Sequence, residues 1–309
     1  MIFAREPSHL STDADGDAPA DLVCIGNVTI DESVQPDGVR REALGGDAIF
    51  AVLAARHVGG RADWLAPLGR DFPAALLDRL ERAGIAQRHD FRRDLESVRN
   101  VITYDAHGNR VWDLVTGRDH FDWMSVHPAD MPDAYLRARG CLLLAMSVPS
   151  QLALTPWLRA HSDATIYLDL EEDGIPGHEE ALRGIVGACD VFLPSEIEAF
   201  RLTGAADLAA AAEELSALGP RTVVIKRAAR GCLVLEAGRL TEVPTEPVVP
   251  VDPTGAGDAF CGAFAATHLR TGDAIAAARA GSSVARLAIG GYGVETLLDD
   301  AIHRRERVS

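Results

Sequence analysis

Apolar runs that favour β-strands alternate with segments of helical spacing over the first part of the chain. DLVCIGNVTID (21–31) and ADWLAPLG (62–69) each predict a strand, and the first strand is expected to end in a loop. A helical pattern follows each run, in LGGDAIFAVLAARHVG (44–59) and FPAALLDRLERAG (72–84). The chain therefore begins as repeated strand–helix units.

This alternation is interrupted once and then resumes. In SVRNVITYDAHGNRVWDLVTG (97–117), two β-rich runs flank the turn signal Ala106–Asn109, which predicts a hairpin outside the main sheet. The later strand-like runs are CLLLAMSVP (141–149), TIYLDLEED (165–173), VFLPSEIEAFRLTG (191–204), RTVVIKRAARGCLVLEAG (221–238) and the start of VVPVDPTGAGDAFCGAF (248–264). Helical segments such as DLAAAAEELSALG (207–219) separate them. The pattern predicts an α/β fold with a mostly parallel sheet covered on both faces.

The length and composition fit one domain with a large core. The chain has 309 residues, of which 47% are hydrophobic, and no linker-like segment divides it. Residues 1–20 are polar and acidic, so a disordered tail is expected before a domain that spans 21–309. No apolar run is long enough to cross a membrane, and the N-terminus lacks a signal-peptide pattern. We expect a cytoplasmic protein with no membrane partner.

Charge and composition exclude several classes of site. The net charge of −16, without a basic stripe, argues against binding to nucleic acid. Lys226 is the only lysine, and no G-x-x-x-x-G-K-[ST] string is present, so a P-loop is excluded. The five cysteines are scattered without metal-binding spacing, which predicts reduced thiols in the core.

Polar and glycine residues recur where the predicted strands end or the helices begin. Ligands of open α/β sheets bind at the carboxyl ends of the strands, so these groups are expected to share one edge. They are Thr29 and Asp31, Gly45 and Gly46, Asp169 and Glu171, Ser195 to Glu198, Lys226 to Gly231, and Asp252 to Asp258.

The segment VDPTGAGDAFCGAF (251–264) is the most informative of these groups. Gly255, Ala256 and Gly257 expose their backbone N–H groups in front of a predicted helix, where the helix dipole favours an anion. Asp258 could simply cap that helix. The same geometry also suits phosphoryl transfer, because the amides would stabilise the transferred group while the carboxylate accepts a hydroxyl proton.

Two segments together resemble a known family. VDPTGAGDAFCGAF is similar to the C-terminal signature of the ribokinase/PfkB carbohydrate and nucleoside kinases, and LGGDAIFAVLAARHVGG resembles their N-terminal Gly-Gly signature. The resemblance covers about residues 21–300. It implies a three-layer α/β/α ribokinase-like fold with a small β-sheet lid, formed by segments near 32–44 and 97–116. It also implies that Asp258 is the catalytic base and that Gly255, Ala256 and Gly257 form the anion hole.

The resemblance further implies a substrate site, a nucleotide site and two kinds of metal ion. The expected substrate-binding residues are Thr29, Asp31, Gly45, Gly46, Asp47, Phe50 and Asp169, with Phe50 where many sugar kinases have Asn. The expected ATP-binding residues are Ser195, Glu198, Lys226, Ala228, Gly231 and Ser282, with Ser195 in place of the Asn of an Asn-x-x-Glu motif. Glu198 would organise Mg²⁺ through water, and Asp252 and Thr254 fit a loop that binds K⁺ in many members. The lid often helps such proteins form dimers.

These features predict an ATP-dependent kinase that phosphorylates a hydroxymethyl group of a sugar or a related small molecule. A nucleoside kinase is the alternative, since the apolar Phe50 suits a base. A non-catalytic sugar-binding regulatory protein is a third possibility, because Ser195, Phe50 and Ser282 depart from the family pattern. An NAD-dependent oxidoreductase is disfavoured, because GNVTID rather than G-x-G-x-x-G follows the first strand.

Overall fold

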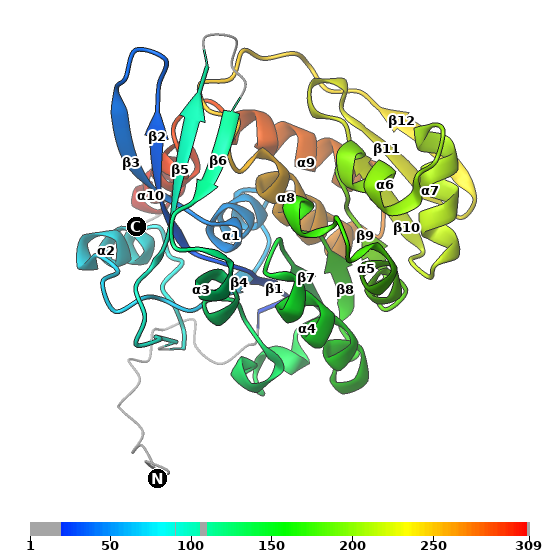
Figure 1. Ribbon diagram of the computed structural model, residues 1–309, viewed down its shortest axis with the longest axis horizontal. Coiled ribbons are helices and arrows are strands. Elements are labelled where there is room, and N and C mark those ends of the chain that lie inside the picture. Colours follow the sequence, from blue (N-terminus) through cyan, green and yellow to red (C-terminus); the bar gives the residue numbers. More distant parts are fainter. Residues whose placement is uncertain (1–19, 90, 106–109, 308–309) are drawn as a thin grey trace.

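A computed structural model describes residues 20–89, 91–105 and 110–307 of the chain (Figure 1). Nearly all of the segment 1–20 and the turn Ala106–Asn109 therefore lie outside the described residues. The described chain forms one large sheet between two layers of helices, with a smaller sheet projecting from one edge. The expected three-layer α/β/α architecture with a small separate β-sheet is confirmed.

The large sheet has eight strands among the described residues, in the order β12-β11-β10-β9-β8-β7-β1-β4. Their bounds are β1 Leu22–Ile25, β4 Ala62–Leu65, β7 Gly140–Leu143, β8 Thr165–Leu168, β9 Val191–Phe192, β10 Thr222–Lys226, β11 Cys232–Glu236 and β12 Arg239–Val243. Six neighbouring strands are parallel, in the order β10-β9-β8-β7-β1-β4. At the β10 edge, β11 and β12 are added in antiparallel pairs. The strand order reverses at β1, between β4 and β7. The carboxyl ends of β1 and β7 thus flank the point where such sheets bind ligands.

Helices cover both faces of this sheet and bury two apolar cores. One layer contains α1 Asp47–His57, α2 Ala74–Arg82, α8 Ala256–Thr271, α9 Ala274–Ala288 and α10 Glu295–Glu306. The other contains α4 Val148–His161, α5 Glu179–Val186, α6 Glu196–Thr203 and α7 Leu208–Ala217. The short helices are α3 Arg118–Trp123, η1 Pro128–Asp130, η2 Tyr135–Arg137, η3 Glu172–Gly174 and η4 Ala228–Arg230. In the described part of the chain, no helix has the length and apolarity that crossing a bilayer requires.

The smaller sheet, which we call the lid, has the order β3-β2-β5-β6. Its strands are β2 Thr29–Val34, β3 Arg40–Gly45, β5 Val98–Tyr104 and β6 Arg110–Leu114. The predicted hairpin is present as the antiparallel pair β5 and β6, and β2 joins it in parallel. Figure 1 shows these strands projecting at the upper left, next to the start of α1.

The first predicted strand was wrong in one respect. Residues 21–31 do not form a strand followed by a loop, because β1 ends at Ile25 and the chain enters the lid at Thr29. The break lies at Gly26, where a side chain would overlap the carboxylate of Asp47. Thr29 and Asp31 therefore belong to a lid strand, and the lid begins before residue 32.

The segment before the glycine loop also differs from the prediction. The apolar run near Val249 forms no strand, and the Val249 side chain is 89% exposed. Pro247 and Pro250 lack the N–H that a ladder needs, so the segment crosses the carboxyl edge as an extended connection. The edge of the sheet is formed instead by β12, which lies just after the predicted run 221–238 and was not predicted as a strand.

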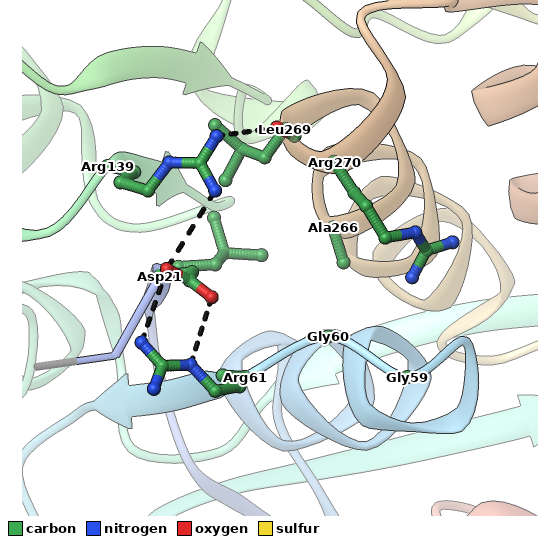
Figure 2. A pocket seen from close by; sticks show the side chains of 9 residues that line it. Asp21, Gly59, Gly60, Arg61, Arg139, Ala266, Leu269 and Arg270 are labelled. Atoms are coloured by element: carbon green, nitrogen blue, oxygen red, sulfur yellow. Dashed lines mark hydrogen bonds and ion pairs between the residues drawn. The ribbon is translucent and has the colours of Figure 1, made fainter. Parts of the chain in front are cut away.

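The opposite edge, at the amino ends of the strands, carries an arginine-rich junction (Figure 2). Asp21, which precedes β1, accepts hydrogen bonds from Arg61 and lies 3.9 Å from the Arg139 guanidinium. Arg139 also donates to the carbonyl of Leu269 near the end of α8. These contacts surround a cavity of about 80 Å³ and fix the start of β1 between the neighbouring strands.

Candidate active site

A cavity of about 630 Å³ opens at the carboxyl edge of the main sheet. Its wall is shared by the lid, the loops after β1, β7 and β8, and the start of α8. The predicted residues that line it are Thr29, Asp31, Gly46, Asp47, Phe50, Asp169, Ser195, Glu198, Thr254, Gly255, Ala256, Gly257 and Asp258. The structure thus brings together residues that lie more than 200 positions apart in the sequence.

The glycine loop is held open by its backbone conformation and by Phe50. Gly255 is the N-cap of α8 and has a φ of 76°, a left-handed value that favours glycine. A Cβ at this position would also overlap the Phe50 ring, which is 1% exposed beneath the loop. The Phe50 ring therefore packs directly against the backbone of Gly255, and only glycine leaves room for this contact.

Asp258 does not cap the helix in front of it. Gly255 is the N-cap, and α8 starts at Ala256, so Asp258 lies at the third helical position. The Ala256 N–H donates to Pro253 O at 3.4 Å, and the other N–H groups of the helix start, together with the helix dipole, favour an anion at this end. Asp258 therefore lines the cavity directly behind the amides that would hold a phosphoryl group.

Asp47, the first residue of α1, contributes a second carboxyl group near Asp258. The backbone N–H of Asn27 donates to Asp47 Oδ1 at 2.5 Å, and the Asn27 side chain donates to Oδ2 at 3.3 Å. Burial raises the pKa of Asp47 well above its usual range, and the negative charge of Asp258 raises it further. The close approach of these two acids was not predicted from the sequence.

Asp31 and Thr29 form the lid side of the cavity. Asn100 of β5 donates to Asp31 Oδ1 at 2.8 Å, and burial raises the pKa of Asp31 to about 6 in spite of this hydrogen bond. The Thr29 hydroxyl lies beside Asp31 and has no hydrogen bond of normal geometry within the described residues. A buried hydroxyl without such a hydrogen bond can form one with a hydroxyl group of a ligand.

The paired glycines between the lid and α1 serve close packing. A Cβ on Gly45 would overlap the side chains of Thr29 and Asp31, and Gly45 itself is not part of the cavity wall. Gly46, with a φ of 101°, lies against the backbone of Asn27 and Val28. Gly45 therefore makes room for the polar lid residues, whereas Gly46 also lines the cavity.

The other end of the cavity contains a coupled set of charged groups. Ser195 and Glu198 form a reciprocal capping box at the start of α6. Burial and the neighbouring Asp169 carboxylate raise the pKa of Glu198 to about 8. Asp169 accepts a 2.6 Å ion pair from Lys226, whose side chain is 13% exposed. Burial acts to lower the pKa of Lys226, but Asp169 raises it above its usual range, so the ammonium stays charged.

Several residues predicted for the nucleotide do not line this cavity. They are Lys226, Ala228, Gly231 and Ser282. Lys226 remains close, since a Cβ on Gly257 would lie 3.6 Å from its Nζ. Gly231 closes a turn in which a side chain would overlap the backbone of Val243 and Pro244. Ser282 is a half-buried residue of α9.

The loop predicted to hold K⁺ is tied to the lid. Asp252 Oδ1 accepts hydrogen bonds from the Tyr104 hydroxyl at 2.5 Å and from the Thr254 N–H at 2.9 Å. Its other oxygen accepts from the Gly293 N–H at 3.3 Å. Tyr104, which was not predicted as a site residue, therefore links strand β5 to the loop that precedes α8.

Two further lining residues, Asn27 and Arg118, were not predicted, and a sequence signal exists only for Asn27. Asn27 lies two residues after the end of β1, where polar ligand-binding groups occur in such sheets, and its side chain also donates to Ala145 O. Arg118 begins α3 and donates to both carboxylate oxygens of Glu171 at 3.3 Å. Glu171 was recognised as a strand-end residue, but its partner lies on a different element of the cavity wall and only the fold identifies it.

The residues present suit magnesium and a nucleotide, although no cluster of three His, Cys, Asp or Glu ligands occurs in the described ranges. Oxygen donors are the ligands that Mg²⁺ prefers, and it usually keeps several waters. Glu198 and Asp169 supply such oxygens on the cavity wall. The N–H groups at the start of α8, near Gly255–Gly257, are of the kind that bind phosphate.

The sequence of this chain is similar to a known protein family and to characterised kinases. The sequence pattern described as pfkB family carbohydrate kinase matches residues 19–301. A cytidine kinase of Thermococcus kodakarensis is 30% identical over 264 residues, which cover 81% of this chain and 89% of that protein. A nucleoside kinase of Methanothermobacter thermautotrophicus is 24% identical over 300 residues, covering 91% of this chain and 93% of its own.

Solved structures share the fold. The nucleoside kinase of Burkholderia thailandensis in complex with inosine has a TM-score of 0.74 and 20% identity, covering 93% of this chain and 97% of that chain. An E. coli protein provisionally assigned as ribokinase II, in complex with ATP and Mg²⁺, has a TM-score of 0.76 and 20% identity, covering 93% and 99%. With the family pattern matched over nearly the whole described chain, this protein belongs to the PfkB family of carbohydrate kinases, phosphotransferases that act on hydroxyl groups.

Proposed function

We propose that this chain transfers the γ-phosphoryl group of ATP to a hydroxymethyl group of a sugar or a sugar-like small molecule, with Asp258 as general base. The observation that carries the proposal is the position of Asp258 at the third residue of α8, behind the Gly255–Gly257 amides on one cavity wall. A carboxylate and an anion cradle at this spacing can act on the same hydroxyl.

The chemistry follows from these two groups. Asp258 takes the proton from the acceptor hydroxyl as its oxygen forms a bond to the γ-phosphorus. The bond from that phosphorus to the β–γ bridging oxygen breaks, and ADP leaves with the electron pair. The amides of Gly255, Ala256 and Gly257 stabilise the charge on the transferred group, and Phe50 keeps the loop above it in place.

The acceptor binds at the lid end of the cavity and the nucleotide at the opposite end. Thr29 and Asp31 bind hydroxyl groups of the acceptor from the lid side. Ser195, Glu198 and Lys226 belong to the nucleotide side, where the Lys226 ammonium lies close to the glycine loop. Glu198, with Asp169 nearby, would hold Mg²⁺ through water, and the metal when bound would neutralise the oxygens of the β- and γ-phosphates.

A potassium ion beside the loop of Asp252 and Thr254 belongs to the same proposal. Both residues are buried directly before the anion cradle, where a cation held by backbone oxygens would fix the direction of the amides. Equal turnover in potassium and in tetramethylammonium chloride would remove this ion from the proposal.

A nucleoside acceptor is the second candidate. The cytidine kinase at 30% identity favours it, and so do three apolar residues on the cavity wall, Leu114, Phe121 and Leu170. An apolar wall suits the faces of a base better than it suits a sugar covered with hydroxyl groups. Phe50 adds no free face, because its ring is covered by the glycine loop.

The test measures ADP release with cytidine, uridine, adenosine, inosine, ribose and fructose as acceptors, for the unaltered protein and for Asp258→Asn. We expect Asp258→Asn to lower kcat by about 10²- to 10⁴-fold, the usual contribution of a general base, while Tm changes little. Asp207→Asn is the matched control, because Asp207 caps α7 outside the cavity and Asn caps equally well.

Two results would contradict the proposal. Full activity of Asp258→Asn would remove Asp258 as the base. Ligand-induced stabilisation without any ADP release across the panel would instead favour the non-catalytic sugar-binding protein, since binding alone raises Tm.

A further inference from the structure

The cavity wall is strongly acidic. Nine of its described lining residues are carboxylic acids: Asp31, Asp47, Asp113, Asp169, Glu171, Glu172, Asp173, Glu198 and Asp258. Against them, Arg118 is the only arginine or lysine that lines the cavity within the described residues. The charge of any acceptor molecule is therefore a property on which this wall can discriminate.

Arg118 is already neutralised by the protein itself. Its guanidinium donates to both oxygens of Glu171, and the Glu171 side chain is 17% exposed whereas that of Arg118 is 61% exposed. Glu172 and Asp173 lie close enough to raise the pKa of Glu171, although burial is the largest cause and Arg118 opposes the shift. Arg118 thus stands in an acidic environment.

The ion pair joins two different elements of the cavity wall. Arg118 starts α3, immediately after lid strand β6, whereas Glu171 follows β8 of the main sheet. Asp113 of β6 lines the same wall. A substrate that enters between the lid and β8 therefore meets carboxylates on both sides and a guanidinium whose hydrogen bonds are directed at Glu171.

We propose that the Arg118–Glu171 ion pair makes the acceptor site selective against anionic molecules, so that the substrate is an uncharged sugar or nucleoside rather than a sugar acid or a nucleotide. This inference rests on the proposed kinase function. An anion loses hydration on entering and gains no free cation, and repulsion by the wall is the negative element that specificity requires. The phosphates of ATP differ because Mg²⁺ accompanies them and the α8 amides receive them.

The test compares kcat/KM for two pairs of acceptors that differ by a carboxylate. The pairs are uridine with 5-carboxyuridine, and fructose with 2-ketogluconate, each of which retains a hydroxymethyl group. We expect the unaltered protein to prefer the neutral member of the pair it phosphorylates by about tenfold or more. Glu171→Gln keeps the side-chain shape but frees the Arg118 charge, so it should narrow that preference by about tenfold.

Two variants separate this role from a structural one. Adding Arg118→Met to Glu171→Gln should restore the preference for the neutral acceptor, because the improved kcat/KM for the anionic acceptor depends on the Arg118 guanidinium. Glu214→Gln is the control, since Glu214 forms a similar ion pair with Arg183 between α5 and α7, outside the cavity. It should leave the preference as in the unaltered protein. A partial loss of folded protein would lower kcat/KM alike for both acceptors of a pair and leave the ratio of the two values unchanged.

A measurement without any substitution covers the case in which Glu171→Gln is unstable. Raising NaCl from about 0.05 to about 0.5 M screens the wall and should narrow the preference of the unaltered protein. Equal kcat/KM for both members of a pair, or a ratio unaffected by Glu171→Gln and by salt, would overturn the inference while leaving the kinase function in place. If no acceptor is phosphorylated at all, the proposed function fails and this inference fails with it.

Discussion

At the scale of single residues, the cavity brings ionisable groups into surroundings that alter their acidity. Asp31, Asp47 and Glu198 all have raised pKa values, and burial is the largest cause in each case. The reason is that a buried carboxylate loses hydration that its neighbours only partly replace. The sequence could name these three acids, but burial is a property of the folded chain, so their acidity could not be predicted from it.

Asp31 gives a pH-dependent prediction. Its pKa is about 6 in the folded chain against 3.8 as the ordinary value, so ionisation destabilises the folded state. The contribution of the protonated Asp31 carboxyl group to the free energy of unfolding is complete below pH 4. It is lost as the pH rises through 6, and the total loss is about 3 kcal/mol. Between pH 5 and 7.5, the unaltered protein should lose about 1 kcal/mol more than Asp31→Asn. Denaturant unfolding at both pH values measures this difference, and parallel losses in the two proteins would contradict it.

At the scale of elements, the sequence predicted the strand–helix alternation, the separate hairpin and the helix behind the glycine loop. These rest on local patterns of apolar spacing and turn residues. It did not predict that β1 stops at Ile25, nor that residues near Val249 leave the sheet. The first depends on tertiary packing, because the Asp47 carboxylate lies against Gly26. The second follows from Pro247 and Pro250, which were present in the sequence and lack the N–H that a strand ladder needs.

The link between the lid and the loop that precedes α8 gives a second prediction. Tyr104 of β5 donates to Asp252, so Tyr104→Phe and Asp252→Asn should be coupled in a double-mutant cycle. We expect a coupling free energy of about 1 kcal/mol or more in unfolding, and a smaller fall in kcat/KM for the double variant than the two single effects predict. Tyr167→Phe, on β8 and bonded to His268, is the control and should add independently to Asp252→Asn. Simple additivity for Tyr104 would argue against the link.

At the scale of the whole molecule, we propose a homodimer formed through the lid. β3 and β6 are the open edges of the lid sheet, and three valines of the lid region, Val39, Val111 and Val115, are 45%, 69% and 57% exposed. Exposed apolar strand edges are the surfaces that pair with another chain. The net charge of −16 opposes the association of two copies, so salt should strengthen it.

Sedimentation velocity tests this assembly. The unaltered protein should sediment as a dimer at about 10 µM, and more completely at higher salt, because salt screens the repulsion between two acidic chains. Val111→Glu should shift it to the monomer. Leu240→Glu, at an exposed position on strand β12 at the far edge of the main sheet, should leave the dimer intact. A monomer at all concentrations, or equal disruption by both variants, would exclude the lid interface.

The sequence by itself determined the α/β class, the glycine loop before a helix, and Asp258 as the carboxylate beside it. These features are local, because each depends on residues within about one turn or one strand of each other. Only the tertiary structure decided that Asn100 contacts Asp31, that Asp47 lies near Asp258, and that Arg118 pairs with Glu171. Such contacts are set by how strands register and elements pack across long stretches of chain, and that arrangement is not written in any single segment.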